Sequence, residues 1–176
     1  MKTIVLRGRC VVPGAAAGTA LVSREAISGW GGMDFSTGVI TERRHPLYGQ
    51  SFAGKVLVFV GAKGSSGWSH YFNLARHSGV APKAMIFNRM STKVALGAVV
   101  SRVPSVTDLD QDPLEVIETG DRVEVEATTG LVTVTKTQSV NGHRNGTPDL
   151  HGIGTPPLDS QTGSARPGGA GRGRLK

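Results

Sequence analysis

The stretch KVLVFVGAKGSSGWSHYF, residues 55–72, joins three sequence patterns that together decide the fold class. It opens with KVLVFV, residues 55–60, and a continuous apolar run of this length is typical of a strand buried on both faces. The small residues of GAKGSSG, residues 61–67, then indicate a loop. From residue 68 onward apolar residues recur at helical spacing, and Gly79 is suited to end the helix. The stretch therefore predicts a strand, a Gly-rich loop and a helix in succession.

Strand and helix patterns continue to alternate on the C-terminal side of this stretch. AMIF, residues 84–87, predicts a second buried strand. STKVALGAVVSR, residues 91–102, predicts a helix in which Ser91 is the N-cap. VPSVTDL, residues 103–109, predicts a short strand. The middle of the chain is therefore expected to consist of strand–helix units.

Two further elements are predicted before the pattern ends. Asp112 can cap a short helix, Pro113 occupies its first position, and Gly120 ends it. In DRVEVEATTGLVTVTK, residues 121–136, apolar residues alternate with polar ones on both sides of a Thr-Gly turn. This period of two predicts a β-hairpin.

The N-terminal third predicts short strands joined by loops. TIVLRGRCVV, residues 3–12, and AGTALVS, residues 17–23, are typical of strands around a Pro-Gly turn. GVITE, residues 38–42, predicts a short strand, and HPLYGQSFAG, residues 45–54, predicts a loop because its proline and glycines interrupt regular structure. A chain that begins and ends in β-structure predicts an α/β fold, with a barrel-like or sandwich β core and flanking helices.

The C-terminal segment differs in composition from the rest of the chain. Residues 138–176 are rich in Gly, Pro, Ser and Thr and contain no aromatic residue, which predicts disorder. We therefore expect one domain over residues 1–136 and a tail over residues 137–176. The end of the tail, ARPGGAGRGRLK, is faintly similar to RGG-type RNA-binding tails. Its composition favours a solubilising extension.

Charge and composition bound the possible functions. The 176 residues carry a formal net charge of +7, which is compatible with an anionic partner. The basic residues of the body form no dense run, so nucleic acid is not expected as a partner. No apolar run approaches the length of a membrane span, and no membrane partner is expected. Cys10 is the one cysteine, which excludes an internal disulfide and predicts a cytoplasmic protein without a cysteine metal site of its own.

The Gly-rich loop is the strongest candidate for a site. A loop between a strand and a helix presents free backbone N–H groups, and these favour an anion at the helix N-terminus. Lys63 adds a positive charge, and Gly64 lets the backbone approach a ligand closely. Ser65 or Ser66 is then an N-cap, an anion ligand or a serine able to move a proton. The pattern alone favours an ordinary cap and turn, because it matches neither a P-loop nor a nucleophile elbow.

Other polar residues give weaker signals. Asp34 either orients a ligand or forms an Asx turn. His45 lies in an Arg-rich loop, ERRHPLYGQ, which could meet an acidic ligand or a partner. His70 and His77 are interpreted as partly exposed helix residues without metal-ligand spacing. Cys10 is expected to be buried in a strand.

Three segments together resemble a known family. They are GGMDFSTGVI (residues 31–40), HPLYGQSFAGKVLVF (residues 45–59) and the Lys-Gly-Ser of the loop (residues 63–65). With them the chain resembles the swivel-domain small subunit of the aconitase X family. The resemblance covers roughly residues 1–136 and implies a swivelling β/β/α domain.

The resemblance also implies an activity and a partner. Aconitase X proteins are hydro-lyases in which a large domain or subunit holds an iron–sulfur cluster, and none is expected in this chain. The small subunit contributes a catalytic serine, which matches Ser65, while Ser69 matches a second family serine. Ser65 is then expected to remove a carbon-bound proton from a small hydroxy acid, either mevalonate 5-phosphate or cis-3-hydroxy-L-proline. Lys63, Gly64, Ser66, Ser69 and Asp34 are expected to bind the substrate or an anion.

One departure and two alternatives accompany this hypothesis. Trp68 stands where the family usually has glycine, so we expect its ring to narrow the pocket or to contact the large subunit. The main alternative is a non-catalytic module that binds RNA, or another anionic partner, through the basic tail. A phosphoryl-carrying swivel domain is disfavoured, because it needs a reactive histidine in the loop and His70 falls inside the predicted helix.

Overall fold

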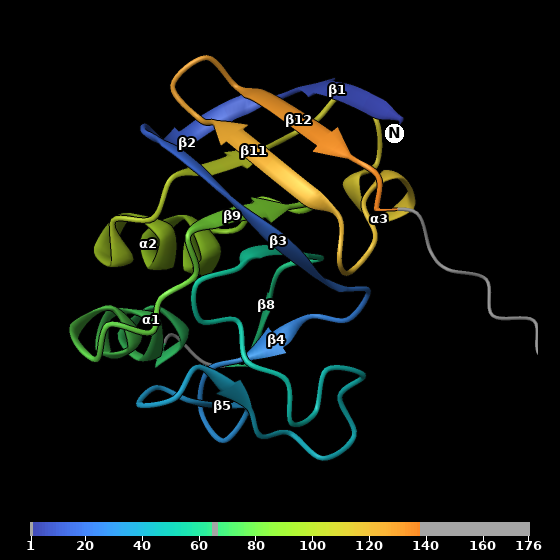
Figure 1. The fold of residues 1–176 in the computed structure, drawn as a ribbon. Helices are drawn as coiled ribbons and strands as arrows, with labels where there is room; N and C mark the ends of the chain where they lie inside the picture. Colours follow the sequence, from blue (N-terminus) through green and yellow to red (C-terminus); the bar gives the residue numbers. More distant parts are fainter. Residues whose placement is uncertain (1, 65–66, 138–176) are drawn as a thin grey trace, which may run out of the picture. The chain divides into compact units, whose positions relative to one another are not determined.

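The computed structural model describes residues 2–64 and 67–137 (Figure 1). The chain divides into two units, Met1–Val140 and Asn141–Lys176. The second unit lies outside the described residues, as does the predicted tail apart from Thr137. Everything that follows therefore concerns the first unit.

An eight-stranded sheet organises this unit, in the order β1-β12-β11-β3-β7-β9-β10-β2. The strands are β1 (Thr3–Arg7), β2 (Arg9–Val12), β3 (Ala15–Ser23), β7 (Val56–Phe59), β9 (Ala84–Phe87), β10 (Ser105–Thr107), β11 (Arg122–Glu126) and β12 (Leu131–Thr135). The two outermost strands, β1 and β2, are separated only by Gly8, so the sheet must curl to bring its two edges together. This curl is the predicted barrel-like core.

Gly8 corrects the prediction of one strand over residues 3–12. The chain changes partner at this residue, since β1 pairs with β12 and β2 pairs with β10. Its N–H donates to the Gly130 carbonyl over 2.8 Å. A Cβ at Gly8 would lie 2.6 Å from the Thr107 oxygen, and one at Gly130 would lie 2.0 Å from the Gly8 oxygen. The crossing of the two strand ends therefore requires two glycines.

The middle of the sheet is parallel and covered on both faces. Strands β3, β7, β9 and β10 pair in parallel. Helices α1 (Gly67–His77) and α2 (Thr92–Ser101) make the crossovers from β7 to β9 and from β9 to β10. All four residues of β7 and of β9 are buried, as the apolar runs predicted.

Alternate residues of the parallel strands supply two hydrophobic clusters. Leu57, Phe59, Met85 and Phe87 belong to the cluster that includes the apolar side chains of α1 and α2. Val56, Val58, Ala84 and Ile86 belong to the cluster that includes the inner face of the β11–β12 hairpin. This alternation follows from the period of two in a strand.

The helix caps follow the sequence closely, apart from one helix end. Ser91 accepts a hydrogen bond from the Val94 N–H at the start of α2. Asp112 does the same for Leu114 at the start of α3 (Pro113–Val116). The predicted end of this helix at Gly120 is wrong. Ile117 already has extended backbone angles and is 1% exposed, so burial of its side chain ends the helix early.

Short strand pairs form the other end of the unit, in the lower part of Figure 1. Strand β4 (Ile27–Ser28) pairs in parallel with β8 (Ala62–Lys63), and β5 (Met33–Asp34) pairs with β6 (Val39–Ile40). The predicted strand at residues 38–42 is thus confirmed over two residues. The predicted loop at residues 45–54 is confirmed as a series of turns. Within the described part of the chain, no helix has both the length and the apolar character that crossing a bilayer requires.

Candidate functional site at the Gly-rich loop

The Gly-rich loop connects β7 to α1, as the sequence predicted. Gly61 and Gly64 both have positive φ angles, +154° and +86°, which favour glycine. Between them, β8 ties the loop to β4, and α1 begins at Gly67. Ser65 and Ser66 lie outside the described residues. The structure therefore defines both borders of the loop, while the roles of these two serines remain predictions.

Lys63 forms an ion pair that the sequence did not suggest. Its Nζ lies 2.7 Å from Oε1 of Glu42, and the two side chains are 39% and 30% exposed. The second carboxylate oxygen of Glu42 is buried without a hydrogen-bond partner among the described residues. The loop thus receives the Lys63 ammonium group together with a partly compensating negative charge.

Lys93 is a second ammonium group at the loop, and sequence reasoning missed it. It lies in the first turn of α2, and its Nζ donates a hydrogen bond to the carbonyl oxygen of Gly64. This contact spans 29 residues of sequence, so no local pattern indicated it. The bond places the Lys93 ammonium group against the backbone of the loop at Gly64.

Trp68 corrects the prediction that its ring narrows the pocket or contacts the large subunit. The side chain is fully buried, its Nε1 donates to the Ile27 carbonyl over 2.9 Å, and its ring stacks on Phe72 at 4.2 Å between centroids. A Cβ at Gly97 would lie 2.1 Å from the indole, and one at Gly29 would lie 2.7 Å from the Trp68 Cα. Gly97 makes room for the ring and Gly29 makes room for the backbone at Trp68, so this residue joins the start of α1 to β4 and α2.

Ser69 lies in the first turn of α1, one residue after Trp68. Its side chain is buried, with 9% exposure. The predicted contact of Ser69 with an anion remains a prediction.

Asp34 forms the turn that was one of its two interpretations. Its Oδ1 accepts hydrogen bonds from the N–H and the hydroxyl of Ser36, and its Oδ2 accepts one from the Thr37 hydroxyl. These bonds, led by that from the Ser36 hydroxyl, lower the pKa of Asp34 below its ordinary value. The carboxylate thus shapes the turn between β5 and β6. Ligand binding by Asp34 remains a prediction.

The histidines and the cysteine occupy unlike environments. His45 is 3% exposed, accepts the Leu47 N–H at Nδ1, and lies 3.2 Å from the Ser23 hydroxyl through Nε2. It therefore holds its own loop together and is not available to meet a partner. His70 and His77 are exposed, as expected. The prediction that Cys10 is buried is wrong, because β2 is an edge strand and the thiol is exposed.

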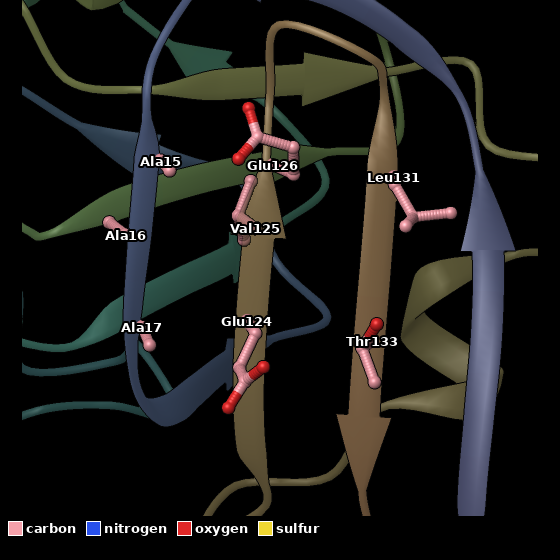
Figure 2. A pocket seen from close by; sticks show the side chains of 8 residues that line it. All are labelled: Ala15, Ala16, Ala17, Glu124, Val125, Glu126, Leu131 and Thr133. Atoms are coloured by element: carbon pink, nitrogen blue, oxygen red, sulfur yellow. The ribbon is translucent and has the colours of Figure 1, made fainter.

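A hollow of about 420 Å³ lies elsewhere, on the outer face of the β3–β11–β12 strands. Figure 2 shows Glu124 and Glu126 on β11, between the small side chains of Ala15 and Ala17 on β3 and those of Leu131 and Thr133 on β12. The hollow exists because the alanine side chains on β3 are too small to fill it. The hollow has no basic lining residue, so it does not suit an anionic substrate.

The described residues do not fit an iron–sulfur cluster. They contain no group of three or more His, Cys, Asp or Glu side chains that could hold a metal ion. Cys10, the single cysteine of the sequence, cannot supply the several thiolates that such clusters take as ligands. The described residues therefore offer no ligand set for such a cluster.

The comparison with known proteins bears on both the fold and the loop. A family model described as the aconitase X swivel domain matches residues 5–134. The chain belongs to the aconitase X swivel-domain family. This confirms the resemblance seen in the sequence, and the matched residues include the whole Gly-rich loop.

Relatives of this swivel domain have been named in several archaea. The phosphomevalonate dehydratase small subunit of Methanocella arvoryzae is 43% identical over 127 residues, which are 72% of this chain and 96% of the relative. That of Thermococcus onnurineus is 41% identical over 129 residues, 73% of this chain and 97% of the relative. The crystal structure of Thermococcus kodakaraensis aconitase X (holo-form) superposes with a TM-score of 0.71 at 38% identity, covering 76% of this chain and 99% of that one. The predicted swivel fold is thereby confirmed.

Proposed function

We propose that this chain is the small subunit of an aconitase X-type hydro-lyase, and that mevalonate 5-phosphate is its substrate. The observation that carries the proposal is the near-complete coverage of relatives named phosphomevalonate dehydratase small subunit at about 40% identity. The named activity requires a large subunit, which we expect to hold the iron–sulfur cluster. When bound in that subunit, such a cluster would supply Lewis-acid chemistry to the dehydration.

Within this proposal the Gly-rich loop supplies the base. The alkoxide of Ser65 takes the carbon-bound proton and becomes the neutral hydroxyl. This alkoxide needs stabilisation because serine is otherwise a weak base. The described borders of the loop support this role. Ammonium groups of Lys63 and Lys93 stand on the strand side and the α2 side of Gly64, and the amide N–H groups of α1 begin at Gly67. Ser66 and Ser69 are proposed to bind the substrate anion beside it.

The basic surroundings favour a phosphorylated substrate over cis-3-hydroxy-L-proline, the other substrate class of this family. Lys63 shares its charge with Glu42, whereas the described ammonium contact of Lys93 is to a neutral carbonyl. In this contact the charge of Lys93 is therefore not offset by a carboxylate. We propose that this charge assists binding of the phosphate.

Reconstitution tests the proposal. The full chain is coexpressed with the large subunit encoded in the same genome, and dehydration of mevalonate 5-phosphate and of cis-3-hydroxy-L-proline is measured. We expect turnover of the phosphate ester that requires both chains. Turnover of cis-3-hydroxy-L-proline alone would show that this compound, and not mevalonate 5-phosphate, is the substrate. Absence of both complex formation and turnover would overturn the proposal. A chain ending at residue 137 is expected to keep the dehydratase activity. The alternative, RNA binding through the tail, predicts instead that this truncation abolishes function.

A further inference from the structure

Two exposed aromatic side chains and one half-buried one form a cluster beside the Gly-rich loop. Trp30 is 77% exposed, the largest exposure among the described large hydrophobic side chains, and Phe35 is 37% exposed. Both rings contact Tyr71 of α1 edge to face, with centroids 6.0 Å apart in each pair. Trp30, Phe35 and Tyr71 are called the aromatic cluster below.

Such a cluster is unusual on a surface that only faces water. Single exposed apolar residues are common, whereas contiguous apolar patches mark interaction sites. Trp and Tyr are enriched among the residues that dominate binding energy at protein interfaces. Edge-to-face contacts also hold the three rings in place before any partner arrives, which reduces the entropy lost on binding.

The aromatic cluster borders the Gly-rich loop. The Ser28 hydroxyl donates to the Trp30 carbonyl, and a Cβ at Gly64 would lie 3.4 Å from the same hydroxyl. On the other side, Tyr71 lies about one helical turn after Gly67, where α1 begins. The aromatic cluster therefore lies beside the described borders of the loop, within reach of a chain that covers it.

We infer that the aromatic cluster is the docking site of the large subunit, with Trp30 as its anchor. This inference rests on the proposed function, which requires a second chain to cover the loop during the reaction. A second copy of this chain is the less suitable occupant, because it would cover the loop without bringing a ligand set for the cluster that the proposed reaction needs, which the described residues lack.

Truncation of Trp30 tests the inference. The full-length Trp30→Ala variant is titrated with the large subunit, and the Kd is measured by calorimetry and by the dependence of turnover on large-subunit concentration. We expect the Kd to rise roughly 30-fold or more, as for truncation of an interface anchor. At saturating large subunit, kcat should stay near the wild-type value. The Trp30→Phe variant should recover part of the affinity.

The control is Val5→Ala, which removes an exposed apolar side chain from β1, at the other end of the unit in Figure 1. Its Kd is expected to match the wild type. A Kd for Trp30→Ala within about threefold of the wild type would overturn the inference, as would loss of self-association with unchanged affinity for the large subunit. If the wild-type chain itself neither binds nor turns over substrate, the proposed function fails instead.

Discussion

Two ends of the domain are stabilised in different ways. We call the part around β11, β12 and β1 the hairpin end, and the part around the short strands β4, β5, β6 and β8 the site end. At the hairpin end, β11 pairs with β12 and with β3 over five residues each, and β12 pairs with β1 over five more. At the site end, β4 pairs with β8 over only two residues, as does β5 with β6. Side chains from distant segments replace the missing ladders there: Trp68 binds Ile27, Lys63 binds Glu42, and Lys93 binds Gly64. The comparison suggests that backbone ladders fix the scaffold, while a few long-range contacts position the loop.

The largest expected effect separates two tryptophans at the site end. Trp68→Ala should lower the free energy of unfolding by about 3–5 kcal/mol, because it empties a fully buried site between α1 and α2. Trp30→Ala is the matched control and should change it by less than about 0.5 kcal/mol, since that ring is exposed. Urea unfolding followed by circular dichroism measures both. Equal effects would show that the site end does not depend on the buried indole.

Removal of the buried carboxylate of Asp121, at the hairpin end, should have the second-largest effect on stability. Asp121 is 2% exposed and accepts hydrogen bonds from Lys136 Nζ at 2.8 Å and from the N–H groups of Glu118 and Thr137. Burial raises the pKa of Asp121, but the hydrogen bond from Lys136 and the two from N–H groups outweigh it and lower the pKa below its ordinary value. Asp121→Asn should cost about 2–3 kcal/mol, because Lys136 loses its buried carboxylate partner and keeps only the Val116 carbonyl at 3.0 Å and the exposed Glu118 at 3.4 Å among the described residues.

The ion pair between Asp121 and Lys136 predicts that the free energy of unfolding depends on pH. Because the folded pKa of Asp121 lies below the unfolded value of about 3.9, its contribution is complete above that value and is lost as pH falls through the folded pKa. Burial lowers the pKa of Lys136, but its bonds to Asp121 and Glu118 raise it overall, so its contribution is lost only as pH rises through the folded pKa. The difference in free energy of unfolding between the wild type and Asp121→Asn should therefore be constant near neutral pH and shrink in acid. A difference that grows below pH 4 would contradict this assignment.

Lys93 offers a smaller effect that falls on activity more than on stability. Lys93→Met removes the hydrogen bond to the Gly64 carbonyl and one charge beside the loop, so we expect kcat/KM of the reconstituted enzyme to fall about 10-fold. The free energy of unfolding should change by less than about 1 kcal/mol. Lys93→Arg should restore much of the loss. Wild-type kcat/KM in the Lys93→Met variant would show that Lys93 does not contribute to the site.

Asp34→Asn is expected to have the smallest effect. The amide oxygen can still accept the Ser36 hydrogen bonds, so the turn between β5 and β6 should persist with a small decrease in Tm. Calorimetry and kcat/KM of the reconstituted enzyme measure the two consequences. A large loss of kcat/KM with unchanged Tm would instead give Asp34 the ligand-binding role that the sequence suggested.

The sequence predicted those features that depend on local patterns. Continuous apolar runs identified β7 and β9, the period of two identified the β11–β12 hairpin, and Ser91 and Asp112 were correctly placed as caps. The Gly-rich loop was located for the same reason, because strand, glycines and helix follow one another within 20 residues of chain.

Features that depend on distant contacts were missed or placed wrongly. Gly8 divides a continuous strand pattern only because Gly130 and Thr107 press against it. The ring of Trp68 was expected at the pocket or at the large subunit, because the glycines that allow its burial are distant in the chain. Gly29, beside its backbone, lies 39 residues before it, and Gly97, beside its ring, lies 29 residues after it. The contact of Lys93 with Gly64 and the exposure of Cys10 likewise follow from strand and helix order, which local spacing does not reveal.

The most direct test of the account is the turnover of the Ser65→Ala variant, reconstituted with the large subunit and assayed with mevalonate 5-phosphate. Removal of a general base predicts a fall in kcat of at least about 100-fold, with unchanged affinity for the large subunit and unchanged Tm. A Ser65→Ala complex that assembles normally and turns over at the wild-type rate would contradict the assignment of the base to this loop.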